Sequence, residues 1–246
     1  KFLGSGTIEV DTTADVTIDT GVGEISDGFI NDAEDGSVTI SGIVNDDRNS
    51  NTVTVTVSDT DGETDDVVSA PVTITGETWS TAALDLSDLT DGTLTITAAL
   101  VDAAGNTVSD TIDGVDSIEL DKTAPAAPAG PLTLAIDVAG SDLTTSTRTI
   151  TGDKESGTGI TLWSDQPGPD PVSIGSVPAD DEDTWSATVD LVHNATHQVT
   201  VIAIDPAGNE SPSSPPLAVE IDTSKPNPPT ALDLADDSNS LLLSDK

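Results

Sequence analysis

Residues 52–57 read Thr-Val-Thr-Val-Thr-Val, a strict alternation of polar and apolar β-branched side chains. Residues 38–40 and 94–96 alternate in the same way. A period of two places one set of side chains on each face of an extended strand, so such a segment has one buried and one solvated face. No segment shows a sustained helical period. The pattern therefore predicts an all-β protein.

The sequence also repeats itself at long range. Residues 118–125 read Ile-Glu-Leu-Asp-Lys-Thr-Ala-Pro, and related versions surround Asp11 and Asp222. The Asp residues of the three copies are separated by 121 − 11 = 110 and 222 − 121 = 101 residues. Further landmarks recur in order between these positions: residues 38–42 and 148–152, Trp79 and Trp185, and the loops 102–106 and 205–209. A unit of this length matches a whole β-sandwich of about seven strands and is too long for a solenoid repeat.

We therefore predict one sandwich over residues 14–121 and a second over 122–222. Residues 1–13 would form a leading joint, and residues 223–246 a joint and the first strand of a third, incomplete sandwich. Because the chain starts with Lys1 and carries no signal peptide, we expect a segment of a longer protein. The expected strands lie near residues 14–19, 37–44, 52–58, 67–75, 78–85, 93–101 and 115–121, and near residues 132–137, 147–152, 159–163, 171–177, 184–190, 197–204 and 216–221.

Proline follows the second and third copies of the repeated Asp, in residues 124–128 and 225–229. Proline fixes φ and removes an amide donor, so these segments are expected to be short, stiff and extended. Joints of this kind leave no room for two domains to fold back side by side, which favours an end-to-end arrangement. Asp15 stands where the other joints have proline, so the first joint is expected to be less stiff.

The composition excludes several classes of function. The chain has 7 Lys and Arg residues against 45 Asp and Glu residues, a formal charge of −38 that would repel nucleic acid and anionic membranes. The absence of cysteine removes disulfides, thiolate metal sites and cysteine nucleophiles together. No apolar run approaches the length of about 18 residues that a membrane-spanning helix requires. Ca²⁺, a hard cation that binds carboxylate and amide oxygens, is the favoured partner.

No motif points to catalysis, because the sequence shows no Ser/His/acid arrangement, phosphate loop or basic patch. His193 and His197 are four residues apart, but that zinc-ligand spacing works on a helix, so both are expected to be exposed histidines. The tryptophans are expected to fill the sandwich cores, since Trp79 and Trp185 occupy equivalent strand positions.

Together these features resemble a known family. The motif around Asp121, the Asp-x-Ala-Gly-Asn loops, the Trp79 and Trp185 strands and residues 27–34 are similar to the bacterial immunoglobulin-like tandem repeats of large secreted RTX or biofilm-associated adhesins. The resemblance implies extracellular domains on a bacterial cell surface. It also implies Ca²⁺-rigidified, non-catalytic spacers that project a distal ligand-binding region. The expected partners are neighbouring repeats of the same chain, and the protein is expected to be a monomer.

Immunoglobulin-like topology predicts which loops meet at a joint. The B–C and F–G loops lie at the pole where strand A begins, and the A–B and E–F loops lie at the opposite pole. Two carboxylates about 4 Å apart repel by roughly 4 kcal/mol at an effective dielectric near 20, and Ca²⁺ removes that repulsion. The predicted calcium ligands are Asp11, Asp27, Asn31, Glu34, Asp102, Asn106, Asp121, Asp153, Asp205, Asn209 and Asp222.

Two alternatives stay open at this stage. The Asp-x-Ala-Gly-Asn segments are also good turns, with the remaining acids serving as a solvated surface. The chain is also compatible with a carbohydrate- or ligand-binding β-sandwich module of a secreted enzyme. A platform on which sugars stack would, however, need exposed aromatic residues, and the chain has only three Trp and two Phe.

Overall fold

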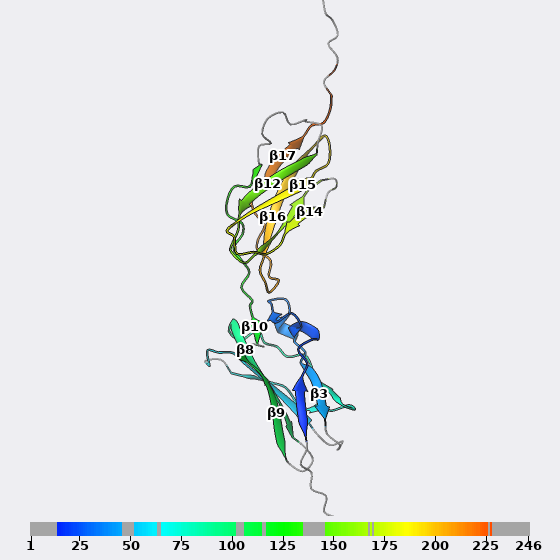
Figure 1. Ribbon diagram of the computed structural model, residues 1–246, viewed down its shortest axis with the longest axis vertical. Helices are drawn as coiled ribbons and strands as arrows, with labels where there is room; N and C mark the ends of the chain where they lie inside the picture. Colours follow the sequence, from blue (N-terminus) through cyan, green and yellow to red (C-terminus); the bar gives the residue numbers. More distant parts are fainter. Residues whose placement is uncertain are drawn as a thin grey trace, which may run out of the picture.

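The computed structural model describes residues 14–45, 52–62, 65–101, 106–114, 117–134, 146–166, 168, 170–225 and 227. The described part forms two β-sandwiches that follow one another along the longest axis of the molecule (Figure 1). Its helical elements are two single 3₁₀ turns, η1 (Gly23–Ile25) and η2 (Asp35–Ser37). The prediction of an all-β protein built from tandem sandwiches is confirmed. The strand expected for a third sandwich, after residue 226, lies outside the described residues.

The first domain packs a three-stranded sheet against a seven-stranded one. The smaller sheet has the order β1-β3-β7, with β1 (Asp15–Ile18), β3 (Ser41–Asn45) and β7 (Thr78–Ser80). The larger sheet has the order β2-β10-β8-β4-β5, with β6 paired to β4 and β9 paired to β8. Its strands are β2 (Phe29–Ile30), β4 (Thr52–Ser58), β5 (Val67–Val68), β6 (Val72–Thr73), β8 (Gly92–Val101), β9 (Thr107–Ile112) and β10 (Ile118–Leu120).

The second domain has a simpler pair of sheets. One has the order β11-β12-β15, and the other has the order β14-β13-β16-β17. The strands are β11 (Thr133–Leu134), β12 (Thr147–Asp153), β13 (Gly159–Ser164), β14 (Val172–Val177), β15 (Thr184–Asp190), β16 (Ala195–Ile204) and β17 (Leu217–Ile221). All ladders in this domain are antiparallel, whereas β10 and β2 of the first domain pair in parallel.

Each domain has its own aliphatic core. Alternation along β4 buries Val53, Val55 and Val57 completely and turns the intervening threonines outward, as the sequence predicts. The first buried cluster runs from Val16 to Leu120 and the second from Leu132 to Ile221. Burial of these Val, Ile and Leu side chains supplies the main stabilising free energy.

A glycine–tryptophan pair occurs at the same register position in both domains. Gly42 lies opposite Trp79, and Gly152 lies opposite Trp185, across the β3–β7 and β12–β15 ladders. A Cβ atom on Gly42 would stand 2.6 Å from the Trp79 ring, and one on Gly152 would stand 2.9 Å from Trp185 Nε1. The indole therefore occupies the space that a side chain on the facing strand would need.

The observed strands differ from the expected ones at several places: β2 is not among the expected strands, and β7 ends at Ser80 instead of near residue 85. Two further differences have a clear cause in the sequence. Residues 107–112 form β9, because Val108 and Ile112 pack inward even though Asp110 interrupts the apolar pattern between them. The Asp110 carboxylate is held there by the backbone N–H of Ile18, at 2.8 Å. Residues 67–75 divide into β5 and β6 because Pro71, which has no N–H to donate, stands between them.

Two residue-level expectations are wrong. Trp163 does not fill the core; it is half-buried on β13 between the inward-facing Leu162 and Ser164. His197 is not exposed, because the alternation of β16 turns it inward, where only 1% of it is accessible. Its Nε2 donates to the Val192 carbonyl at 3.0 Å, so Nδ1, which lies 2.8 Å from Ser164 Oγ, accepts the hydroxyl proton of that serine.

No helix among the described residues is long and apolar enough to cross a membrane.

We predict that Gly152→Ala destabilises the second domain by about 1–3 kcal/mol, because the new methyl group overlaps the Trp185 indole. Calorimetric melting would show a lower melting temperature for that domain. Gly168→Ala is the matched control, since a Cβ there meets nothing within 4 Å. Equal melting of the two variants would contradict the packing described for Gly152.

Candidate functional site at the junction of the two domains

The facing ends of the two domains are joined by direct hydrogen bonds. The side-chain amide of Asn31, in the first domain, donates to the Ala207 carbonyl at 2.9 Å. The backbone N–H of Asp32 donates to Asn209 Oδ1 at 3.2 Å, and Asn209 Nδ2 donates to the Asp121 carbonyl at 2.8 Å. The loop after β2 and the turn after β16 are thus held together at the narrow waist of the molecule (Figure 1).

The turn of the second domain is shaped by its own sequence. The backbone N–H of Asn209 donates to Asp205 Oδ1 at 2.8 Å, and the Asn209 side chain donates to Asp205 Oδ2 at 2.9 Å. Gly208 has a φ of +93°, a conformation that favours glycine. This turn leaves Asn209 only 7% exposed and directs it at the first domain. The Asp-x-Ala-Gly-Asn sequence therefore acts both as a turn and as the interdomain contact.

The receiving loop of the first domain is held by hydrogen bonds within itself. Asn31 Oδ1 accepts the N–H of Ala33 at 2.9 Å, and Glu34 Oε2 accepts the N–H of Asn31 at 3.2 Å. The backbone N–H groups of Glu34 and Asp35 both donate to the Asn31 carbonyl. Because these bonds fix the Asn31 backbone, its amide is presented to the second domain in one orientation.

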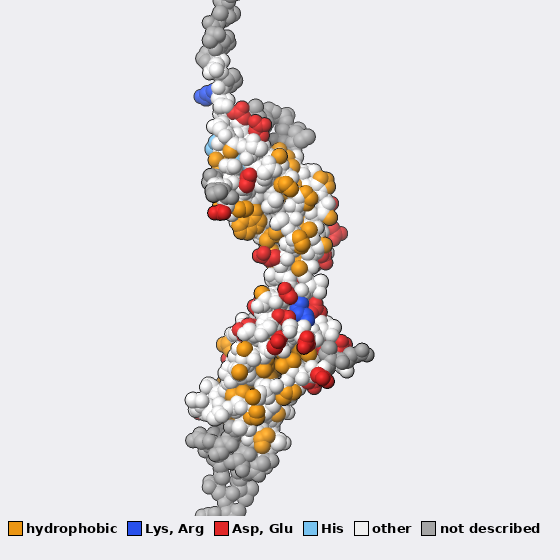
Figure 2. Space-filling view, turned by 180° about the vertical axis from the view of Figure 1, so that it is seen from behind, with side chains coloured by type: hydrophobic (Ala, Val, Ile, Leu, Met, Phe, Trp, Pro, Cys, Tyr) orange, Lys and Arg blue, Asp and Glu red, His pale blue; other side chains and the backbone are white. Residues whose placement is uncertain are grey.

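Two lysines supply positive charge on either side of the junction. Lys122 Nζ donates to the carbonyls of Ser87 at 2.8 Å and Leu89 at 2.6 Å, and lies 3.9 Å from Asp91 Oδ1. It thereby fastens the loop between β7 and β8 to the linker. Figure 2 shows blue basic atoms at the waist, surrounded by red acidic ones.

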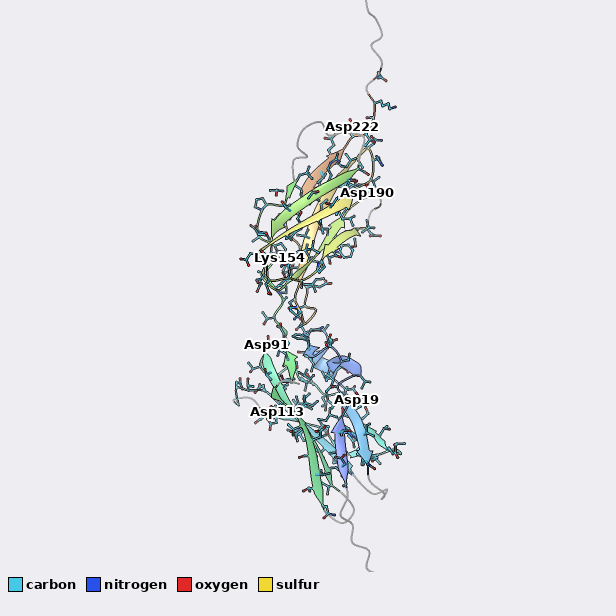
Figure 3. The ribbon with its side chains drawn as sticks, in the orientation of Figure 1. Asp19, Asp91, Asp113, Lys154, Asp190 and Asp222 are labelled. Carbon is cyan, nitrogen blue, oxygen red and sulfur yellow. The ribbon has the colours of Figure 1, made fainter. Side chains whose placement is uncertain are left out.

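The second lysine, Lys154, has a fully enclosed side chain. Its Nζ donates to the Thr158 carbonyl at 2.9 Å, the Asp180 carbonyl at 2.9 Å and Asp180 Oδ1 at 2.8 Å. Figure 3 places Lys154 and Asp91 on the facing ends of the two domains. Sequence reasoning missed both lysines, although a count of only 7 basic residues was a signal that each could matter.

The linker also forms a hydrogen bond with the second domain. Glu155 Oε2 accepts the backbone N–H of Ala126 at 3.3 Å. Beside the linker lies a groove of about 400 Å³, and its polar lining includes Asn31, Asp32, Lys122 and Glu210. The proline-containing segment thus has Glu155 of the second domain as a hydrogen-bond partner and a groove with polar lining beside it.

Negative charge accumulates at the junction around Asp121. Burial raises the pKa of the Asp121 carboxyl above its ordinary value, the N–H of Thr123 opposes this shift, and the charges of Asp205 and Asp91 raise the pKa further. The ionised form of Asp121 is thus disfavoured by its surroundings, and a cation placed beside it would relieve that repulsion.

The predicted calcium ligands divide into several locations. Asn31, Glu34, Asp121, Asp205 and Asn209 come together at the junction. Asp153 lies near the same pole, where a Cβ on Gly130 would stand 2.7 Å from Asp153 Oδ2.

Four of the remaining ligands are distributed along the molecule or fall outside the described residues. Asp27 lines a separate groove of about 580 Å³ that also includes Asp110 and Asp113. Asp222 bonds to Ser224 at the far end of the second domain. Asp11 and Asp102 lie outside the described residues.

Asn106, the last of the predicted ligands, precedes β9. Its neighbour Thr107 pairs with Val101, at the end of β8 that points away from the junction. Asn106 thus lies at the end of the first domain away from the junction, as the loop topology predicts for its F–G turn, and its role as a calcium ligand stays a prediction.

A calcium ion fits only part of the junction's donor set. Among the described residues, no group of three or more His, Asp or Glu side chains is arranged to hold a metal ion. The amides of Asn31 and Asn209 and both carboxylate oxygens of Asp205 already serve hydrogen bonds. Each carboxylate oxygen has a second lone pair, so the Asp121 and Asp205 carboxylates are the donors that best suit a cation.

Comparison with known proteins gives structural likeness only. No protein-family model and no curated protein matches the chain. A tetra-tandem repeat in the extending region of a large adhesion protein is 26% identical over 86% of this chain and 50% of its own, with a TM-score of 0.35. A 1.5-MDa bacterial ice-binding adhesin gives 24% identity over 87% of this chain and 66% of its own, with a TM-score of 0.42.

The third match is to the FN1–FN3 domains of chicken CNTN1. It is 14% identical over 79% of this chain and 62% of its own, with a TM-score of 0.47. The chain thus spans half to two thirds of the length of these solved structures.

We predict that Asn209→Ala uncouples the two domains, because it removes the bonds to the Asp121 carbonyl and the Asp32 N–H, each worth about 0.5–1.5 kcal/mol. Small-angle scattering would show a broader range of interdomain angles. Asn194→Ala, which removes a side-chain bond to Thr223 N at the far end, is the control and should leave that range unchanged. Unchanged scattering from Asn209→Ala would show that the linker alone sets the angle.

We predict that Asp121→Asn raises the melting temperature at pH 7 in the absence of calcium. The folded-state pKa of Asp121 is raised above its ordinary value of 3.8, so the ionised carboxylate opposes folding. That penalty is absent at a pH below the ordinary pKa of 3.8, and it sets in as the pH rises through the raised pKa of the folded state. The advantage of the variant should therefore shrink as the pH falls towards 3, and a constant advantage across that range would contradict the assignment.

Proposed function

We propose that this chain is a pair of extender domains from a bacterial cell-surface adhesin, with calcium at the junction and a distal ligand-binding region projected by the array. The single observation that carries the proposal is the contact of Asn209 with both Asp121 and Asp32. This contact joins the domains directly and fixes the angle between them. A spacer needs that property, whereas a chain of independent binding modules does not.

The linker supports the same role. Residues 122–128 contain Pro125 and Pro128, and the backbone of this segment is held by Asp91, Glu155 and the Lys122 contacts. A short proline-containing segment that is bonded at both ends transmits force with little extension. The motif resemblance around the repeated Asp adds that such units recur in tandem, so the same joint would be reproduced along a longer chain.

A buried pair that could suggest catalysis has a structural explanation. Ser164 Oγ lies 2.8 Å from His197 Nδ1, but each residue is only 1% exposed. A nucleophile in that position cannot reach a substrate. The pair instead satisfies polar groups inside the second domain, which supports a non-catalytic function.

Calcium would act at the junction by neutralising charge. Asp121 and Asp205 are the residues that would hold it, with water and backbone oxygens to complete the six to eight ligands that the ion takes. The ion would offset the repulsion among Asp121, Asp205 and Asp91 while Asn209 keeps its hydrogen bonds. The joint would then be held by two independent means, one polar and one ionic.

Calorimetric melting in EDTA, in Ca²⁺ and in Mg²⁺ tests the calcium proposal. We expect Ca²⁺ at about 100 times its dissociation constant to stabilise the protein by roughly 2.7 kcal/mol per site. Mg²⁺ should substitute poorly, because it demands a small octahedral shell and gives up water reluctantly. Asp121→Asn should abolish most of the response at the junction.

The control is Asp170→Asn, which removes the same charge from an exposed loop away from the junction. It should respond to calcium as the unaltered protein does. Identical melting of the unaltered protein in all three solutions would contradict calcium rigidification, and equal responses of the two variants would place the ion elsewhere.

A further inference from the structure

One tryptophan lies on a solvated face and is not used by either core. Along β13, Ile160, Leu162 and Ser164 are buried, whereas Trp163 points to the opposite side of the sheet and is half-buried. The cluster that forms the second core contains Trp185 but not Trp163. A chain with only three tryptophans therefore leaves one of them on the outer face of the β14-β13-β16-β17 sheet, on the strand between β14 and β16.

The strand pairing shows which groups surround this indole. Trp163 lies opposite Ser173 on β14 and opposite Thr200 on β16. The next outward position on β13 is Thr161, whose partners are Ser176 and Ile202. The residues paired with this part of β13 are thus mainly hydroxyl-bearing, in a molecule whose formal charge is −38.

One carboxylate borders this neighbourhood in a fixed orientation. Asp165 Oδ1 accepts the backbone N–H of Gln198 at 2.8 Å, and Gln198 is itself exposed beside Thr200 on β16. A carboxylate oxygen and a primary amide therefore stand at one end of the aromatic surface. Such groups are suited to accept from and donate to the hydroxyl groups of a ligand.

The backbone is irregular at the same position. The pairing of β13 with β14 shifts register between Leu162 and Trp163. A bulge of this kind changes the direction of a side chain and is frequent beside binding sites.

We propose that this face, centred on Trp163, binds a neutral saccharide. A sugar ring presents C–H groups on its flat face and hydroxyl groups on its rim, which match the indole and the surrounding Ser, Thr and Gln side chains in turn. The charge of the chain disfavours anionic polymers.

A single site of this type would be weak, and its use would come from repetition. If equivalent domains recur in tandem, several weak contacts with one polysaccharide add through effective concentration. The inference does not depend on the stiffness of the junction, because the Trp163 face belongs to the second domain alone. Failure of the calcium proposal would leave it unchanged.

Titration with uncharged oligosaccharides, namely linear β-glucan, α-mannan and galactan fragments, tests the proposal through tryptophan fluorescence. Because Trp79 and Trp185 are buried, a saturable change reports Trp163. We expect Trp163→Ala to weaken binding by at least about tenfold and Trp163→Phe to retain most of it, since a phenyl ring still stacks. Gln198→Ala should weaken binding several-fold with no change in melting temperature, which keeps the test valid if Trp163→Ala misfolds.

The matched control is Thr97→Val on the outer face of β8 in the first domain, where the hydroxyl of Thr97 bonds to Thr111 and no tryptophan is present. It should bind as the unaltered protein does. The proposal is overturned if none of the neutral fragments gives a saturable change, if Trp163→Ala binds equally well, or if sulfated dextran binds more tightly than any of them.

Discussion

The hydrogen bonds of Asn209 determine how the two domains can be arranged. Its side chain reaches the Asp121 carbonyl and the Asp32 N–H from a turn that Asp205 holds in shape. These bonds require the loop after β2 and the turn after β16 to meet at one place. The linker contacts follow from that meeting, because Glu155 and Lys122 then lie on either side of residues 122–128. In a molecule with so much negative charge, a neutral amide can make this contact without adding to the repulsion.

The sequence predicts the fold well because its signals are local and periodic. The alternation of 52–57 reflects a rule that holds within a few residues, and the equivalence of Trp79 and Trp185 reflects repetition of the whole unit. Where one residue interrupts the alternation, the prediction fails. Asp110 interrupts the apolar pattern of β9, so the sequence does not predict that strand, and Pro71 divides one expected strand into β5 and β6. The predictions for His197 and Trp163 fail for a related reason. Residue type suggests an exposed histidine and a buried tryptophan, whereas the alternation of their strands turns His197 inward and Trp163 outward.

The site is predicted less completely than the fold. The recurrent Asp-x-Ala-Gly-Asn motif does identify the turn that reaches the first domain, because recurrence at a fixed offset marks an equivalent place in each unit. Sequence alone cannot tell that Asp27 borders a separate groove with Asp110, or that Lys122 and Lys154 enclose their charges among carbonyl oxygens. Apart from the Lys154–Thr158 bond, those facts depend on residues 26 or more positions apart, which no local pattern records.

The path of the chain also decides how a stretched molecule would yield. The described part of the chain begins at one end of the long axis and leaves at the other, so tension would pass through both domains in series (Figure 1). In the first domain that load enters through β1 and leaves through β10, which has three paired positions with β8 and two with β2. In the second it leaves through β17, which has five paired positions with β16. Five paired positions therefore bear the load at each exit strand, but β10 divides them between two neighbouring strands whereas β17 depends on β16 alone.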